Sequence, residues 1–89
     1  MMEIVLYSKL NCQFCNKAKH MIKSLGLKYT EKKMEDFESP KAMLEDIGKP
    51  VRTMPQIKID DKLIGGYNQL IEYFMVKGRV NFKGEVTSE

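Results

Sequence analysis

The sequence lacks the features that attach a protein to a membrane or send it out of the cell. No apolar run in its 89 residues approaches the roughly 18 residues that a membrane-spanning helix needs. The N-terminus has neither a basic start nor a long apolar stretch, so we identify no signal peptide. There is also no linker, repeat or low-complexity tract. We therefore expect a soluble cytoplasmic protein with no membrane partner.

Potential metal ligands are equally scarce. The chain has only two cysteines, Cys12 and Cys15, and one histidine, His20. Tetrahedral zinc takes about four ligands, so these residues could hold zinc only if two chains shared the site. We interpret His20 as a solvated surface residue. A structural disulfide is the other alternative, but so short a loop constrains little of the unfolded chain. In the reducing cytosol, a close cysteine pair indicates a catalytic or metal-binding role rather than a structural disulfide.

The charge excess is small. The net charge is +3, and the lysines are spread along the chain rather than clustered. This distribution does not indicate a nucleic-acid partner. It fits an anionic small molecule or an acidic protein surface, or simply a solvated surface with a slight excess of lysine.

What the sequence does contain is a regular alternation of strand and helix patterns. Its periodicities predict the order β-α-β-α-β-β-α, and so a four-stranded mixed sheet with helices on both faces. The expected domain is 1–78, followed by a mostly polar tail, 79–89, in which Val80, Phe82 and Val86 are the apolar candidates for contact with the body. The predicted elements are a strand 3–7, a helix ending at Gly26, an edge strand 28–34, a helix from Ser39-Pro40 to Gly48, a hairpin 56–64 that Gly65-Gly66 ends, and a last helix that ends near Gly78. The apolar stripe of the last helix, which we expect in the core, consists of Leu70, Ile71, Phe74 and Met75.

The two cysteines lie at i and i+3, where the first strand passes into the first helix. A helix N-terminus stabilises an anion, so a cysteine placed there ionises readily. Cys15 shares the inward helix face with Ala18 and Ile22, whereas Cys12 is expected to stay accessible. The spacing therefore predicts that Cys12 attacks a disulfide and that Cys15 resolves the resulting mixed disulfide.

Two further positions could serve this chemistry. Lys9 lies three residues before Cys12, where its charge would favour the thiolate or bind a carboxylate. The Gly65-Gly66 turn leads into a helix N-terminus that could bind a carboxylate, although a plain chain reversal with Asn68 as the N-cap explains it equally well. Pro55 precedes a strand, and spacing alone predicts no cis bond there.

Three motifs together resemble the glutaredoxin family. They are the segment from Tyr7 to Cys15, the segment from Arg52 to Gln56, and Gly65-Gly66-Tyr67. The resemblance spans residues 3 to about 76, and the chain is also similar to the small glutaredoxins of large bacteriophages. Thioredoxin itself is a poorer match, because no tryptophan precedes the first cysteine and no Gly-Pro separates the pair.

The resemblance implies a thioredoxin fold with sheet order 2-1-3-4, an antiparallel third strand and a cis bond between Met54 and Pro55. It implies a thiol–disulfide oxidoreductase with no tightly bound cofactor or metal and with glutathione as co-substrate. It also implies a set of glutathione-binding residues, namely Lys9, Phe14, Arg52, Thr53, Met54, Pro55, Gly66, Tyr67 and Asn68.

Two departures from the family pattern bear on the reductant. Gln13 replaces the usual proline after the first cysteine, and Asn68 and Gln69 stand where an aspartate commonly binds the γ-glutamyl ammonium. Gln13 frees a backbone N–H near the thiolate and leaves the loop less rigid, which alters the reduction potential. Asn68 and Gln69 imply weaker glutathione binding, so we expect the reductant to be glutathione or a thioredoxin-reductase-type enzyme, with the balance towards the reductase. The expected form is a monomer acting on protein disulfides, with ribonucleotide reductase as a substrate by family analogy. The alternatives are an iron–sulfur cluster carrier that uses Cys12 and glutathione, a thioredoxin-like protein reduced by a thioredoxin reductase, and a partner-binding module without enzymatic activity.

Overall fold

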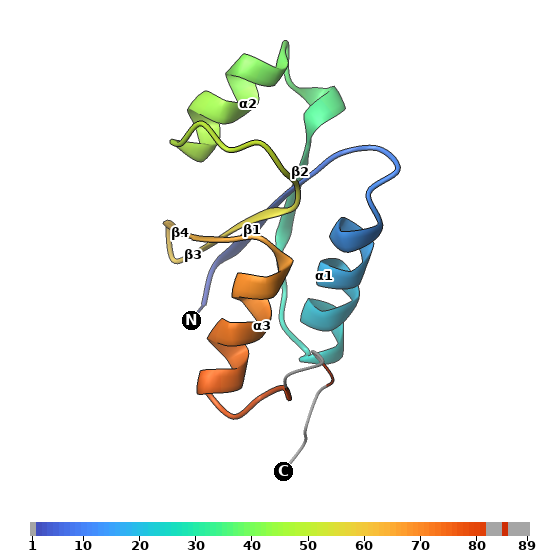
Figure 1. Cartoon of the computed structure of the whole chain (residues 1–89), viewed down its shortest axis with the longest axis vertical. Helices are drawn as coiled ribbons and strands as arrows, with labels where there is room; N and C mark the ends of the chain where they lie inside the picture. Colours follow the sequence, from blue (N-terminus) through green and yellow to red (C-terminus); the bar gives the residue numbers. More distant parts are fainter. Residues whose placement is uncertain (1, 82–84, 86–89) are drawn as a thin grey trace.

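The computed structural model describes residues 2–81 and 85. Within them the alternation expected from the sequence is present, and Figure 1 shows the elements in order along the chain. A short 3-10 turn, Met34–Asp36, which the sequence did not predict, follows the second strand. The elements are β1 (Ile4–Ser8), α1 (Gln13–Ser24), β2 (Thr30–Lys33), α2 (Pro40–Ile47), β3 (Gln56–Ile59), β4 (Lys62–Gly65) and α3 (Tyr67–Val76).

The sheet has the order β2-β1-β3-β4, as the resemblance implied. The central strand β1 pairs in parallel with β2 and antiparallel with β3, and β3 pairs antiparallel with β4. Since β1 is buried between two neighbours, its sequence is almost wholly apolar. β2 lies at an edge and is half exposed, which agrees with its lysine-rich sequence.

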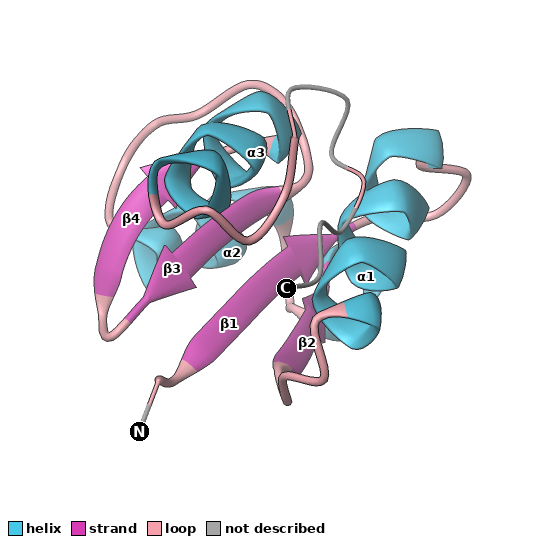
Figure 2. Cartoon of the chain, turned by 90° about the horizontal axis from the view of Figure 1, so that it is seen from below, coloured by secondary structure: helices cyan, strands magenta, loops and turns pink. Residues whose placement is uncertain are grey.

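The helices cover both faces of this sheet. α1 and α3 pack side by side on one face and α2 lies on the other, as Figure 2 shows. Alternation along β1 explains the two cores, because Ile4 and Leu6 belong to the α1/α3 cluster while Tyr7 belongs to the α2 cluster. The mixed two-faced fold predicted from the sequence is therefore confirmed.

Local sequence signals set most of the helix ends. The Ser39 side chain accepts a hydrogen bond from the backbone N–H of Ala42, and Pro40 occupies the first turn of α2. That helix ends at Gly48, whose φ of 93° lies in the left-handed region where glycine is favoured.

The start of α3 follows the glycine pair, and the alternative in which Asn68 caps this helix is wrong. Gly66, not Asn68, is its N-cap residue, and the helix starts at Tyr67. Gln69 folds back so that its Oε1 accepts a hydrogen bond of 2.9 Å from the Gly66 backbone N–H. This is the contact that a glutamine at the third helical position makes in a capping box. Met75, expected in the core, is 40% exposed.

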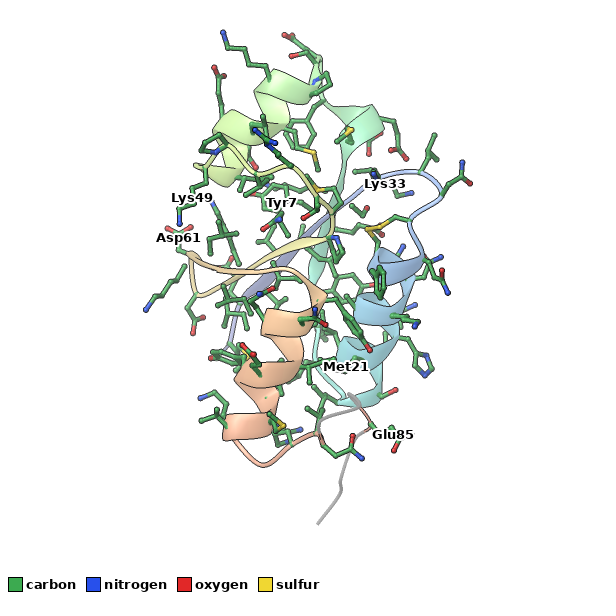
Figure 3. The ribbon with its side chains drawn as sticks, in the orientation of Figure 1. Tyr7, Met21, Lys33, Lys49, Asp61 and Glu85 are labelled. Carbon is green, nitrogen blue, oxygen red and sulfur yellow. A yellow bond between two sulfur atoms is a disulfide. The ribbon has the colours of Figure 1, made fainter. Side chains whose placement is uncertain are left out.

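A tether between side chains holds α2 on the sheet. The Tyr7 hydroxyl, buried beneath α2 (Figure 3), donates a 2.8 Å hydrogen bond to the Asp46 carboxylate. Lys32 donates to the same carboxylate, and Lys58 donates to the Asp46 carbonyl oxygen. Hydrogen bonds from Lys32 and Tyr7 lower the pKa of Asp46. Three strands are thereby linked to the C-terminal turn of one helix.

The chain remains packed beyond Gly78. Val80 is 3% exposed and belongs to the α1/α3 core, and the Arg79 side chain donates to the Leu25 carbonyl oxygen at the end of α1. Phe82 and Val86 lie outside the described residues. Among residues 2–81 and 85, no helix combines the length and the apolar character that a membrane crossing requires.

Candidate functional site

The two cysteines form a disulfide at the N-terminus of α1. Cys12 is the N-cap residue, and its Sγ accepts a 3.1 Å hydrogen bond from the Cys15 backbone N–H. Cys15 is 1% exposed and Cys12 is 8% exposed. The predicted order of exposure is therefore right, but the expectation that Cys12 stays accessible is wrong for the disulfide form. A segment far along the chain covers it.

That segment contains Thr53, Met54 and Pro55. The Met54 carbonyl oxygen lies 3.7 Å from the Cys12 Sγ. A thiol at this place could donate a hydrogen bond to the carbonyl, whereas a disulfide sulfur has no proton to donate. The Met54–Pro55 bond is cis, as the resemblance implied, and Pro55 is buried. Gln56 holds the segment, because its side-chain amide donates a 2.9 Å hydrogen bond to the Thr53 carbonyl oxygen.

A pocket of about 230 Å³ opens beside the disulfide. It is bounded by the first turn of α1, by the segment before β3 and by the start of α3. Seven of the nine predicted glutathione-binding residues line it; Lys9 and Arg52 do not. The lining residues are Phe14, Thr53, Met54, Pro55, Gly66, Tyr67, Asn68 and Gln69.

Gln69 is the lining residue that was absent from the predicted set. Its hydrogen bond with the Gly66 N–H occupies one of the donors at the start of α3. Its side chain also packs tightly on Gly65, where an added Cβ would lie only 2.8 Å from the Gln69 Cγ. The spacing of a glutamine three residues after the N-cap position is the sequence signal that could have identified it.

The outer wall of the pocket is aromatic. The rings of Phe14 and Tyr67 lie 5.9 Å apart between centroids and are tilted by 36°. The Lys17 Nζ lies 5.2 Å from the centroid of the Phe14 ring, within range of a cation–π interaction. Phe14 nevertheless remains 53% exposed, so the wall is open to a partner on its outer side.

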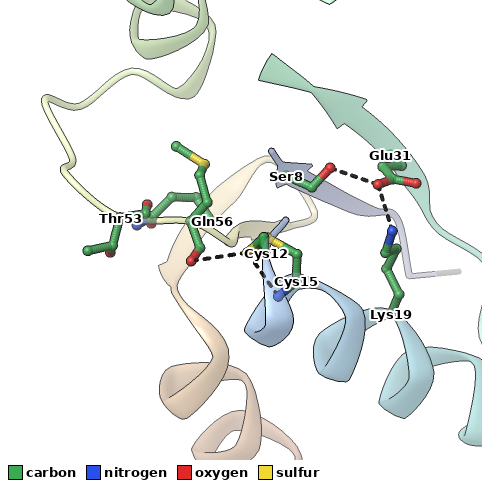
Figure 4. The surroundings of a disulfide bond; sticks show 8 residues. Ser8, Cys12, Cys15, Lys19, Glu31, Thr53 and Gln56 are labelled. Carbon is green, nitrogen blue, oxygen red and sulfur yellow. Dashed lines mark hydrogen bonds and ion pairs between the residues drawn. A yellow bond between two sulfur atoms is a disulfide. The ribbon is translucent and has the colours of Figure 1, made fainter. Parts of the chain in front are cut away.

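A second polar group lies close to the cysteines. Ser8 is 2% exposed, and its hydroxyl donates a 2.7 Å hydrogen bond to the Glu31 carboxylate, which also forms an ion pair with Lys19 (Figure 4). Burial raises the pKa of Glu31, but the hydrogen bonds from Ser8 and Lys19 outweigh it and lower the pKa below 4.5. The sequence suggested no role for Ser8, which reads as the polar end of a buried strand.

The other sequence candidates lie apart from the pocket. Lys9 and Arg52 are exposed in loops, and His20 is exposed on α1. No group of three or more His, Cys, Asp or Glu side chains suited to a metal ion lies within the described residues.

The cis proline segment, the cysteine pair at a helix N-terminus and the 2-1-3-4 sheet define a dithiol protein of the thioredoxin fold. The model of the family described as glutaredoxin matches residues 4–64. The chain belongs to the glutaredoxin family, whose members are thiol–disulfide oxidoreductases.

Individual relatives agree with this assignment. Glutaredoxin 1 of Escherichia coli is 32% identical over 72 residues, covering 74% of this chain and 85% of the relative. A probable glutaredoxin of Synechocystis is 31% identical over 68 residues, and the match spans 76% of this chain but only 62% of the relative's length.

Solved structures show the same fold. Glutaredoxin 1 from Francisella tularensis, complexed with cacodylate, superimposes with a TM-score of 0.72 at 25% identity, over 86% of this chain and 95% of that one. A buckwheat glutaredoxin–glutathione complex gives a TM-score of 0.70 at 27% identity, over 83% and 69% of the two chains.

Proposed function

We propose that this protein reduces disulfides through the Cys12–Cys15 dithiol. The Cys12 thiolate attacks one sulfur of a substrate disulfide, and the first substrate sulfur leaves as a thiolate that takes up a proton from solvent. The Cys15 thiol then loses its proton and attacks the Cys12 Sγ, which breaks the mixed disulfide and releases the second substrate thiol. Two electrons pass to the substrate, and the disulfide seen here is the oxidised product.

The N-cap position of Cys12 carries this proposal. The hydrogen bond that its sulfur accepts from the Cys15 N–H, together with the positive end of the α1 dipole, favours a thiolate on Cys12. The same N–H cannot serve Cys15, which is buried on the inward face of the helix. The nearby Met54 carbonyl oxygen acts in the opposite direction, because it favours the protonated thiol.

Glutathione is the co-substrate that the pocket suits, with no tightly bound cofactor. Seven of the residues predicted to bind glutathione line this pocket. The related buckwheat glutaredoxin has been solved as a complex with glutathione. Lys9 and Arg52 would meet a carboxylate at the approaches to the pocket. No lining residue is acidic, so the γ-glutamyl ammonium would find no carboxylate partner there. This supports weak glutathione binding, with a thioredoxin reductase as the principal electron source.

The substrates we propose are protein disulfides and glutathione mixed disulfides in the cytoplasm. Ribonucleotide reductase is a candidate by analogy with the family alone. A steady-state assay that supplies either glutathione with its reductase or a thioredoxin reductase decides the electron source. Faster turnover with millimolar glutathione than with the reductase would contradict our proposal.

Serine variants test the roles of the two cysteines. Cys12→Ser should be inactive towards both insulin disulfides and a glutathione mixed disulfide. Cys15→Ser should still exchange with the glutathione mixed disulfide but should accumulate as a mixed disulfide with insulin, visible by mass spectrometry. Ser24→Ala, at the exposed far end of α1, is the control and should behave as the wild type. Exchange that survives in Cys12→Ser would overturn the assignment.

A further inference from the structure

The surface around the disulfide carries charge of one sign. No aspartate or glutamate occurs in residues 4–30 or in residues 47–59, the segments that contain the cysteines and the cis proline. The third segment of the site, residues 65–69, is uncharged. The acidic residues lie elsewhere, many of them in residues 31–46.

Three exposed cations belong to the segments that carry the disulfide and the cis proline. Lys9 lies three residues before Cys12, Arg52 lies two residues before Met54, and the Lys17 Nζ lies 5.2 Å from the centroid of the Phe14 ring. Within residues 2–81 and 85, no carboxylate forms an ion pair with any of these three, although Lys19 and Lys32 are paired. Their field is therefore not cancelled locally.

Two exposed apolar side chains lie among these cations. Leu10 is 68% exposed in the loop that leads to Cys12, and Phe14 is 53% exposed on the first turn of α1. Neither Leu10 nor Lys17 lines the pocket proposed for glutathione. The basic and apolar surface thus extends beyond the space that a tripeptide would occupy.

We propose that this surface, formed by Lys9, Leu10, Phe14, Lys17 and Arg52, docks an acidic polypeptide segment that carries the substrate disulfide. This inference rests on the proposed dithiol activity and names its substrate class. Acidic side chains flanking the substrate cysteines meet the unpaired cations, which speeds encounter and holds the disulfide over Cys12. A polypeptide is favoured over a tripeptide because Leu10 and Lys17 lie outside the pocket proposed for glutathione.

Single-turnover kinetics with matched peptides test the proposal. Pre-reduced protein is mixed with three disulfide peptides that differ only in whether glutamate, glutamine or lysine flanks the cysteines. Acid quenching and alkylation, followed by mass spectrometry of the peptide, then count the peptide thiols formed, since each reduced peptide gains two thiols while the protein loses two. We expect the glutamate peptide to react about tenfold or more faster than the lysine peptide at low salt. The difference should shrink at 1 M salt, where the screening length is only about 3 Å.

Charge reversal locates the effect. In Lys17→Glu, the ratio of the glutamate-peptide rate to the lysine-peptide rate should fall several-fold, and taking the ratio cancels any change in thiol reactivity. Lys62→Glu makes the same charge change on β4. Lys62 is exposed and pairs with Ile59, at the opposite end of β3 from Gln56 and the cis proline segment, so this variant should keep the wild-type ratio. Equal rates for the three peptides, or equal effects of both variants, would overturn the docking surface. Failure to reduce any peptide would instead overturn the proposed activity.

Discussion

The two adjacent glycines at the start of α3 should respond very differently to alanine. Gly65 has a φ of +119°, a region that side chains rarely adopt, and an added Cβ would lie 2.8 Å from the Gln69 Cγ. Gly66 has an ordinary φ of −96°, and its added Cβ would meet the Pro55 carbonyl oxygen at 3.3 Å. The first substitution is therefore strained in two ways, whereas the second needs only a small shift.

The expected magnitudes follow from these two kinds of strain. The unfavourable φ in Gly65→Ala costs about 1–3 kcal/mol. Displacing Gln69 also breaks its hydrogen bond to the Gly66 N–H, which adds about 0.5–1.5 kcal/mol. We expect Gly65→Ala to lower the free energy of unfolding by about 1.5–4.5 kcal/mol, the sum of these two contributions, and Gly66→Ala by less than about 1 kcal/mol.

Urea unfolding of both variants, each also made in a Gln69→Ala background, measures the two contributions. If the contact with the glutamine matters, Gly65→Ala should cost about 0.5–1.5 kcal/mol less in that background. Gly48→Ala is the control for backbone strain, because its φ is +93° but no atom lies within 4 Å of its added Cβ. Equal destabilisation by Gly65→Ala and Gly66→Ala would refute the reasoning.

Two further predictions concern the body of the fold. Burial raises the pKa of Glu31, but the hydrogen bonds from Ser8 and Lys19 outweigh burial and lower this pKa below 4.5. The ionised carboxylate therefore stabilises the fold above pH 4.5. This stabilisation is lost as the pH falls through the lowered pKa. The stability difference between the wild type and Glu31→Gln, measured by urea unfolding from pH 7 to 3, should therefore shrink below about pH 4.5; a constant difference would contradict this. Val80→Ala should destabilise by about 1–3 kcal/mol because Val80 is 3% exposed, and Val76→Ala, at an 86% exposed residue, is its control. Equal thermal stability of these two variants would exclude a core role for Val80.

Several features of the fold could be predicted because their causes are local. The alternation of β1, the apolar stripe of α1 and the cap formed by Ser39 and Pro40 each depend on residues within a turn or two of one another. The placement of Cys12 at a helix N-terminus follows from the same kind of signal.

The resemblance supplied what spacing could not, such as the cis bond before Pro55. It did not predict the hydrogen bond from Gly66 to Gln69, because the family usually has an aspartate in this part of the chain. The sequence also did not predict the burial of Cys12, because the Met54 carbonyl oxygen that lies beside the Cys12 Sγ is 42 residues further along the chain.

The order of the elements and the place of the cysteine pair at the start of a helix follow from the linear sequence. Hydrophobic periodicity and helix caps depend on residues only a few positions apart, so both are visible along the chain. The contact of Met54 with Cys12 and the hydrogen bond between Ser8 and Glu31 depend instead on the tertiary structure. These two contacts arise when β1, β2 and β3 align in one sheet, which brings together segments that are far apart in the sequence.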